Sequence, residues 1–95
     1  METKAIWKYE LPLESCGQPQ EVEIPDGATI LSAMNQDEKL VVYAMVAPAR
    51  KPRKYQFKVF MTGQAIPFTV NHHFVGTVAF QGGDFVVHVF ETNRW

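Results

Sequence analysis

Residues 73–91 read HFVGTVAFQGGDFVVHVFE, and this stretch decides the fold class. It consists of two runs rich in β-branched and aromatic residues, a composition that favours β-strands. Gly82 and Gly83 separate the runs, and adjacent glycines are typical of hairpin turns because they tolerate positive φ. The stretch therefore predicts two antiparallel strands joined by a turn at Gly82-Gly83.

The same pattern extends through the rest of the chain. Apolar and polar residues alternate over residues 4–11, so Trp7, Tyr9 and Leu11 would share one face of a strand. Further strands are predicted at residues 21–24, 29–34, 40–46 and 55–61. A helix over 28–34 is the alternative, but Thr29 and Ile30 favour a strand. About seven short strands predict a single all-β domain over residues 1–95, either a small antiparallel sandwich or a partly open barrel.

Composition and charge narrow the class of protein. A chain of 95 residues that is 46% hydrophobic and 13% aromatic predicts a folded domain rather than a disordered segment. Its net charge of −1 gives no overall attraction to nucleic acid or to an anionic membrane. The core of so short a chain is small, and we expect a homo-oligomer. With Cys16 as its single cysteine and no apolar leader at the start, the chain is expected to work in the cytoplasm without a disulfide.

Five of the nine basic residues fall between Arg50 and Lys58. We refer to Arg50, Lys51, Arg53 and Lys54 as the basic cluster. The functional interpretation is a positively charged loop, flanked by Tyr55, that binds a phosphate or an acidic partner. The alternative is a solvated connection between two strands. Eight of the ten acidic residues lie between Glu2 and Glu38, so these acids could also pair with the basic cluster of a second copy.

Candidate catalytic and metal-binding residues are few. His72 and His73 are adjacent, and neighbouring strand residues point to opposite faces, which makes a shared metal ion improbable. His88 has no serine or acid at a recognisable spacing, so we interpret it as a structural or interface residue. Cys16 has Glu14 nearby and no base close in sequence, which disfavours a reactive thiolate. We therefore expect no catalytic residues, no metal and no cofactor.

Several short runs, taken in order, resemble one family of small proteins. They are IWKYEL at residues 6–11, PDGA at 25–28, TGQAIP at 62–67, FVGTV at 74–78 and HVFE at 88–91. The family occurs mainly in bacteriophages and prophage-bearing bacteria, and the resemblance covers nearly the full chain. It implies a phage accessory protein that acts in the host cell cytoplasm, and it transfers no catalytic residue. The basic stretch at residues 50–54 departs from the usual family pattern.

These observations favour a binding protein over an enzyme. Our leading hypothesis is a phage accessory protein that occupies or sequesters a host factor, either a host protein or a small phosphorylated molecule, with counter-defence as one such role. The first alternative is a structural or assembly component of the virion. The second is an enzyme with an unrecognised site, since function does not follow from fold.

Overall fold

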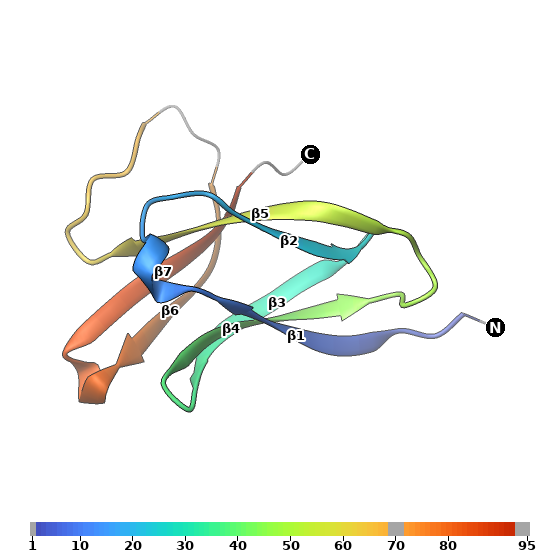
Figure 1. Cartoon of the computed structure of the whole chain (residues 1–95), viewed down its shortest axis with the longest axis horizontal. Coiled ribbons are helices and arrows are strands. Elements are labelled where there is room, and N and C mark those ends of the chain that lie inside the picture. The colour runs from blue at the N-terminus through green and yellow to red at the C-terminus, as the bar shows by residue number, and fades with distance from the viewer. Residues whose placement is uncertain (1, 69–71, 93–95) are drawn as a thin grey trace.

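The computed structural model describes residues 2–68 and 72–92, which form two packed antiparallel β-sheets (Figure 1). The sheets do not close into a barrel, so the structure confirms the prediction of an all-β fold and selects the sandwich. No helix within the described residues is both long and apolar enough to cross a bilayer.

Seven strands make up the two sheets. The three-stranded sheet has the order β1 (Ala5–Leu11), β4 (Lys39–Val46) and β3 (Thr29–Gln36). The four-stranded sheet has the order β2 (Gln20–Pro25), β5 (Pro52–Met61), β7 (Phe85–Thr92) and β6 (His72–Phe80). Two single 3-10 turns complete the described elements, η1 (Leu13–Ser15) and η2 (Gln81–Gly83). The segment 28–34, for which a helix was the alternative, lies mostly in strand β3.

The hairpin that decides the fold class is β6–β7. Its innermost pair is Phe80 with Phe85, which confirms the two predicted strands. The turn is longer than the predicted Gly82-Gly83 pair, because Gln81 also adopts a positive φ of 52° and joins the short turn η2. Gly82 and Gly83 have φ values of 67° and 101°, where a side chain would be strained. Glycine is therefore needed here for the reason the sequence suggested, within a wider connection.

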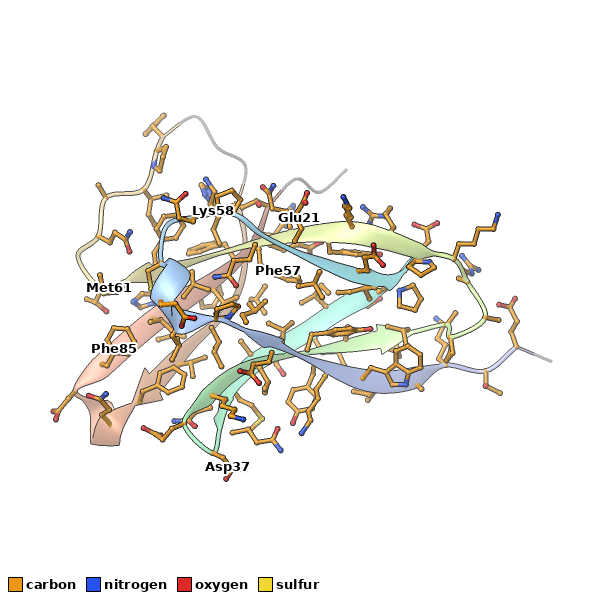
Figure 2. The ribbon with its side chains drawn as sticks, viewed as in Figure 1. Glu21, Asp37, Phe57, Lys58, Met61 and Phe85 are labelled. Atoms are coloured by element: carbon orange, nitrogen blue, oxygen red, sulfur yellow. The ribbon has the colours of Figure 1, made fainter. Side chains whose placement is uncertain are left out.

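The core lies between the sheets and follows from the alternation along each strand. Phe57 and Val59 of β5 are fully buried, and so are Val87 and Val89 of β7. Figure 2 shows Phe57 between the two layers, whereas Glu21 and Lys58 lie towards the upper margin. The three-stranded sheet supplies Leu11 of β1 and four residues of β4, namely Leu40, Val42, Ala44 and Val46. Val41 on the outer face is also only 5% exposed, which agrees with β4 being the central strand of its sheet.

The two sheets meet closely along one side of the sandwich. Strand β3 packs against β6, and a Cβ built on Gly76 would lie 3.5 Å from the backbone of Ala33. Both strands are irregular there, with register shifts between Ile30 and Ser32 and between Phe74 and Gly76. A bulge bends an edge strand and interrupts its free hydrogen-bonding groups. This side of the sandwich is therefore closed, with its edges protected.

A cluster of polar side chains ties the sheets together at the β3–β4 turn. Glu38 accepts hydrogen bonds from the Gln81 backbone N–H at 2.9 Å and from Asn35 Nδ2 at 2.6 Å. Asn35 Nδ2 also donates to the Ala79 carbonyl at 3.1 Å. The hydrogen bonds from Asn35 and then from Gln81 lower the pKa of the Glu38 carboxyl. The ionised carboxylate of Glu38 thus joins the turn of one sheet to the hairpin of the other.

Candidate functional site

A cleft of about 540 Å³ lies at the opposite end of the sandwich. It lies where the β2–β3 turn meets the start of β5 and the end of β7. Residues 26–29 of the turn form one wall, and Arg53, Tyr55 and Glu91 contribute the rest. We call it the Arg53 cleft, because the guanidinium of Arg53 is the one cationic group among these lining residues.

Arg53 is held in place by two contacts. Its Nε donates to Oδ1 of Asp26 at 3.0 Å, and its Cζ lies 4.0 Å from the centroid of the Tyr55 ring. Desolvation disfavours the charge, yet the contacts with Tyr55 and Asp26 outweigh it and raise the pKa of Arg53. The carboxylate engages Nε, and the terminal amino groups of a guanidinium form a planar fork of donors that suits a carboxylate or a phosphate.

Tyr55 is buried, and its ring packs against the guanidinium of Arg53. Its side chain is only 3% exposed, and its hydroxyl accepts a hydrogen bond from the Ala28 backbone N–H at 2.9 Å. Ala28 immediately precedes strand β3, so this bond connects the two sheets at the cleft. We conclude that Tyr55 is a positioning residue whose ring carries the guanidinium and whose hydroxyl fixes the β2–β3 turn.

The basic cluster is not a single loop, and this part of the sequence prediction was wrong. Strand β5 begins at Pro52, so only Arg50 and Lys51 remain in the connection. Residues on a strand alternate between its two faces. Arg53 therefore joins Tyr55 on the inner face, whereas Lys54 lies on the outer face opposite Glu23 of β2. The eight residues between the predicted strands 40–46 and 55–61 contain two prolines, which suggested a loop. Pairing with β2 instead extends strand β5 across Arg53 and Lys54.

Arg50 and Lys51 lie against the same β2–β3 turn. The Asp26 N–H donates to the Lys51 carbonyl at 2.9 Å, and Arg50 Nε lies 4.0 Å from Glu2 Oε1. A Cβ built on Gly27 would lie 3.2 Å from Arg50 Nη1, so the second guanidinium covers the turn. Within one copy of the chain, the acids that contact the basic cluster are Glu2 and Asp26. Pairing of the acids with the basic cluster of a second copy stays a prediction.

The sequence analysis missed two acidic residues that line the Arg53 cleft, Asp26 and Glu91. Asp26 was interpreted only as a turn residue, although it lies beside a strand that pairs with the basic cluster. Glu91 is 4% exposed and continues the buried positions Val87 and Val89 on the inner face of β7. That period of two was visible in the sequence and could have indicated a buried acid at the end of the strand.

One comparison with known proteins identifies the family. A profile for a domain of unknown function, DUF7352, matches residues 2–94. The chain belongs to the DUF7352 family. No curated protein and no solved structure matches it significantly. The family assignment therefore covers the whole described sandwich but brings no function with it, and the site has to be interpreted from its own geometry.

Two of the three histidines of this DUF7352 chain, His72 and His88, contact neighbouring side chains on the outer face of the four-stranded sheet. His88 Nε2 lies 2.9 Å from Thr62 Oγ1, and His88 Nδ1 lies 3.0 Å from Thr77 Oγ1. The His72 ring makes edge contacts with Phe60 and Phe90, at centroid distances of 5.8 and 5.4 Å. These contacts agree with a structural role for His88. Burial raises the pKa of the Cys16 thiol, which lowers its thiolate fraction.

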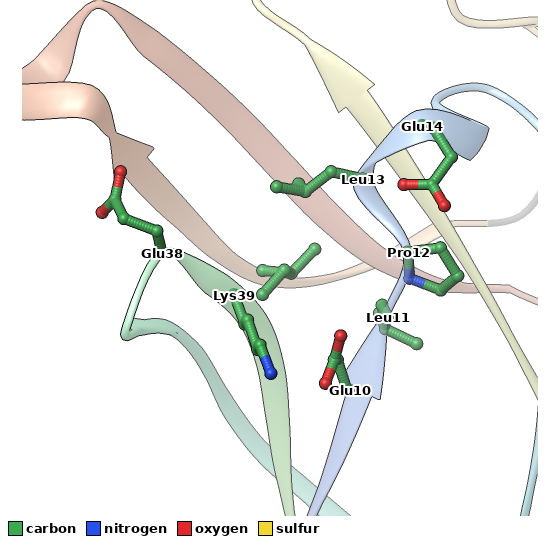
Figure 3. Close-up of a pocket in the computed structure, with 8 residues that line it drawn as sticks. Glu10, Leu11, Pro12, Leu13, Glu14, Glu38 and Lys39 are labelled. Carbon is green, nitrogen blue, oxygen red and sulfur yellow. The ribbon is translucent and has the colours of Figure 1, made fainter.

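A second hollow of about 370 Å³ lies at the end of the sandwich near the β3–β4 turn (Figure 3). Glu10, Glu14, Glu38 and Lys39 line it together with apolar side chains. Glu38 already accepts the two hydrogen bonds described above. Within residues 2–68 and 72–92, no three His, Cys, Asp or Glu side chains are grouped so that they could hold a metal ion. This hollow is the weaker candidate for binding a carboxylate or a phosphate, since three of its four charged lining residues are acidic.

Proposed function

We propose that this DUF7352 chain is a non-enzymatic accessory binding protein of phage origin, and that it occupies a host factor by binding an anionic group at the Arg53 cleft. The group is a carboxylate or a phosphate, presented by a host protein or by a small phosphorylated molecule in the host cytoplasm. The observation that carries the proposal is the arrangement of Arg53, which Asp26 and Tyr55 hold in one orientation beside an open cleft.

Preorganisation matters because a flexible side chain loses rotamer freedom when it binds, at a cost of about 0.5–1.5 kcal/mol. The contacts of Arg53 within the folded protein already meet part of that cost. Arg50, Lys51 and Lys54 are exposed around the turn and strand that flank the cleft. They would add long-range attraction to an acidic ligand, and that attraction is screened over about 8–10 Å at ordinary salt concentrations.

Titration of ¹⁵N-labelled protein with inorganic phosphate and with a short polyglutamate peptide tests the proposal and separates the two ligand sources. We expect amide shifts at residues 26–29 and 53–55, weakening as salt is raised. Arg53→Lys keeps the charge but loses the planar fork, and it should weaken binding severalfold. Lys8→Ser, which removes an exposed lysine from strand β1, is the matched control and should bind like the parent. Unchanged spectra with both probes at low salt would contradict the proposal.

The alternative function, a structural or assembly component of the virion, is favoured by a different observation. Several large apolar side chains are exposed, among them Phe74 at 62%, Met34 at 47% and Ile66 at 44%. They lie on different parts of the molecule rather than around the Arg53 cleft. If apolar self-association into large particles survives removal of the basic cluster, this alternative gains over the binding proposal.

A further inference from the structure

The four edge strands of the sandwich differ in how well they are protected. An unprotected edge strand presents unpaired backbone N–H and C=O groups to which another strand can add. Strands β3 and β6 carry bulges and pack against each other. Strand β2 has six residues, ends at Pro25 and carries Glu21 and Glu23 on its outer face. Proline and charge are the usual devices that prevent edge pairing.

Strand β1 has none of the breaks found in the other three. Its register with β4 is continuous from Ala5–Val46 to Leu11–Leu40, and it contains neither proline nor glycine. Ile6 is 62% exposed and Trp7 is 42% exposed. Figure 1 shows the N-terminal half of β1 along the lower margin of the molecule, and none of the described strands pairs with its outer edge. Its charged residues, Lys8 and Glu10, are the features of this strand that would oppose pairing.

We propose that strand β1 pairs with β1 of a second copy, in antiparallel orientation about a two-fold axis at Trp7. The two three-stranded sheets would then join into one continuous six-stranded sheet. This inference does not depend on the Arg53 cleft, which lies between other strands. The occupant is a second copy because Lys4 and Glu10 are complementary in this register, whereas the two adjacent registers place lysines opposite each other.

The register follows from the charges. In a two-fold antiparallel pair, directly opposite residues lie on the same face of the sheet. The axis therefore passes midway between the two copies of one residue, and we name the axis after that residue. An axis at Trp7 places Lys4, which immediately precedes β1, opposite Glu10 of the second copy, and it does so twice in the dimer. Opposite charges on facing strands attract, whereas like charges directly opposite each other are destabilising.

The neighbouring registers fail for specific reasons. An axis at Ile6 places Lys4 opposite Lys8, and an axis at Lys8 places that lysine opposite its own copy. An axis at Tyr9 matches Lys8 with Glu10 but places Pro12, which has no N–H, opposite Ile6. The axis at Trp7 therefore combines opposite charges, an uninterrupted strand and a central aromatic pair.

Charge reversal tests both the interface and its register, with the mass measured by sedimentation equilibrium. Over concentrations from about 1 µM to about 1 mM, a span that covers weak to moderate association, the parent should approach twice its 10.8 kDa chain mass. Lys4→Glu and Glu10→Lys should each weaken the dimer about tenfold, because two attractive pairs become repulsive. The double variant Lys4→Glu/Glu10→Lys should restore it. Lys58→Glu makes the same change of charge on β5 of the other sheet (Figure 2), and it should leave the dimer intact.

Two results would overturn the inference. The first is a parent that stays at the mass of one chain up to about 1 mM, where even weak pairing becomes visible. The second is a dimer that responds to Lys58→Glu as it does to Lys4→Glu, or that the double variant does not restore. Hydrogen exchange distinguishes loss of the dimer from loss of the fold. On dilution of the parent, protection of the β1 amides should fall, while the core amides of Val87 and Val89 should remain protected.

Discussion

Replacement of Tyr55 by phenylalanine isolates the hydrogen bond that joins the two sheets at the Arg53 cleft. The Tyr55 hydroxyl accepts from the Ala28 N–H at 2.9 Å, and the centroid of its ring lies 4.0 Å from Arg53 Cζ. Tyr55→Phe therefore removes one bond and keeps the stacked pair. A net hydrogen bond contributes about 0.5–1.5 kcal/mol, and a donor left without a partner in a partly buried position costs about 1–3 kcal/mol.

We expect Tyr55→Phe to lower the free energy of unfolding by about 1–2 kcal/mol, because the Ala28 N–H is only partly buried and can still reach water. For a domain of this size, about 1 kcal/mol corresponds to a fall of about 4–8 °C in the midpoint of thermal unfolding. Urea unfolding measures the loss directly, and an unchanged m value would show that the compactness of neither state has changed. Hydrogen exchange should show faster opening at Ala28.

The matched control is Tyr43→Phe. The Tyr43 hydroxyl donates to Gln36 Oε1 at 3.0 Å on the outer face of the three-stranded sheet, so its removal leaves the contact between the sheets intact. Since the Gln36 side chain can turn to solvent, we expect less than half the loss seen for Tyr55→Phe. Equal losses for the two variants, or a loss below about 0.3 kcal/mol for Tyr55→Phe, would refute the inference that this bond ties the sheets together.

Three further outcomes follow from the structure. Phe57→Ala should cost about 3–5 kcal/mol in chemical denaturation, because the ring is fully buried; a cost below about 1 kcal/mol would mean that Phe57 is not central to the core. Arg53→Ser should lower the unfolding free energy by about 1 kcal/mol, because it removes an exposed ion pair and a cation–π contact. Lys51→Ser should lie within about 0.5 kcal/mol of the parent. Equal effects of the two variants would contradict the inference that the contacts of Arg53 stabilise the fold. Hydrogen bonds lower the pKa of Glu38 in the folded state, so its stabilisation is present above its usual value of 4.5 and is lost as pH falls through the lowered value. Thermal midpoints measured between about pH 3 and 7 should accordingly converge for the parent and Glu38→Gln at the acidic end, and a constant difference would contradict the assignment.

Local patterns were enough to predict the strands. Side chains on a strand alternate with a period of two, and the alternation of Phe57 and Val59 or of Val87 and Val89 reports which face is buried. The paired glycines of the β6–β7 connection marked the hairpin for an equally local reason, their tolerance of positive φ. Neither inference requires contacts between residues far apart in the chain, which is why both could be made from the sequence.

The candidate site was predicted only in part. The basic cluster was visible as a run of charges, but the partners of Arg53 were not. Asp26 is 27 residues away in the chain and reaches Arg53 because β2 pairs with β5 in a register that places Ile24 opposite Arg53. Residues of a strand alternate between its two faces, whereas residues of a loop do not. Because Arg53 and Lys54 were expected in a loop, their opposite orientations were not predicted. The register of pairing is a property of two strands together, and one run of residues does not contain it.

The all-β class, the approximate strands and the position of the charge cluster each depend on residues close together in the chain, so they could be read from the sequence. The order of strands within the two sheets, the cleft beside Arg53 and the unbroken outer edge of β1 became known only from the folded structure. Those features arise from contacts between segments far apart in sequence, such as β3 against β6 and β7 between β5 and β6. Many pairings would satisfy the same alternation, and packing of the shared core selects among them.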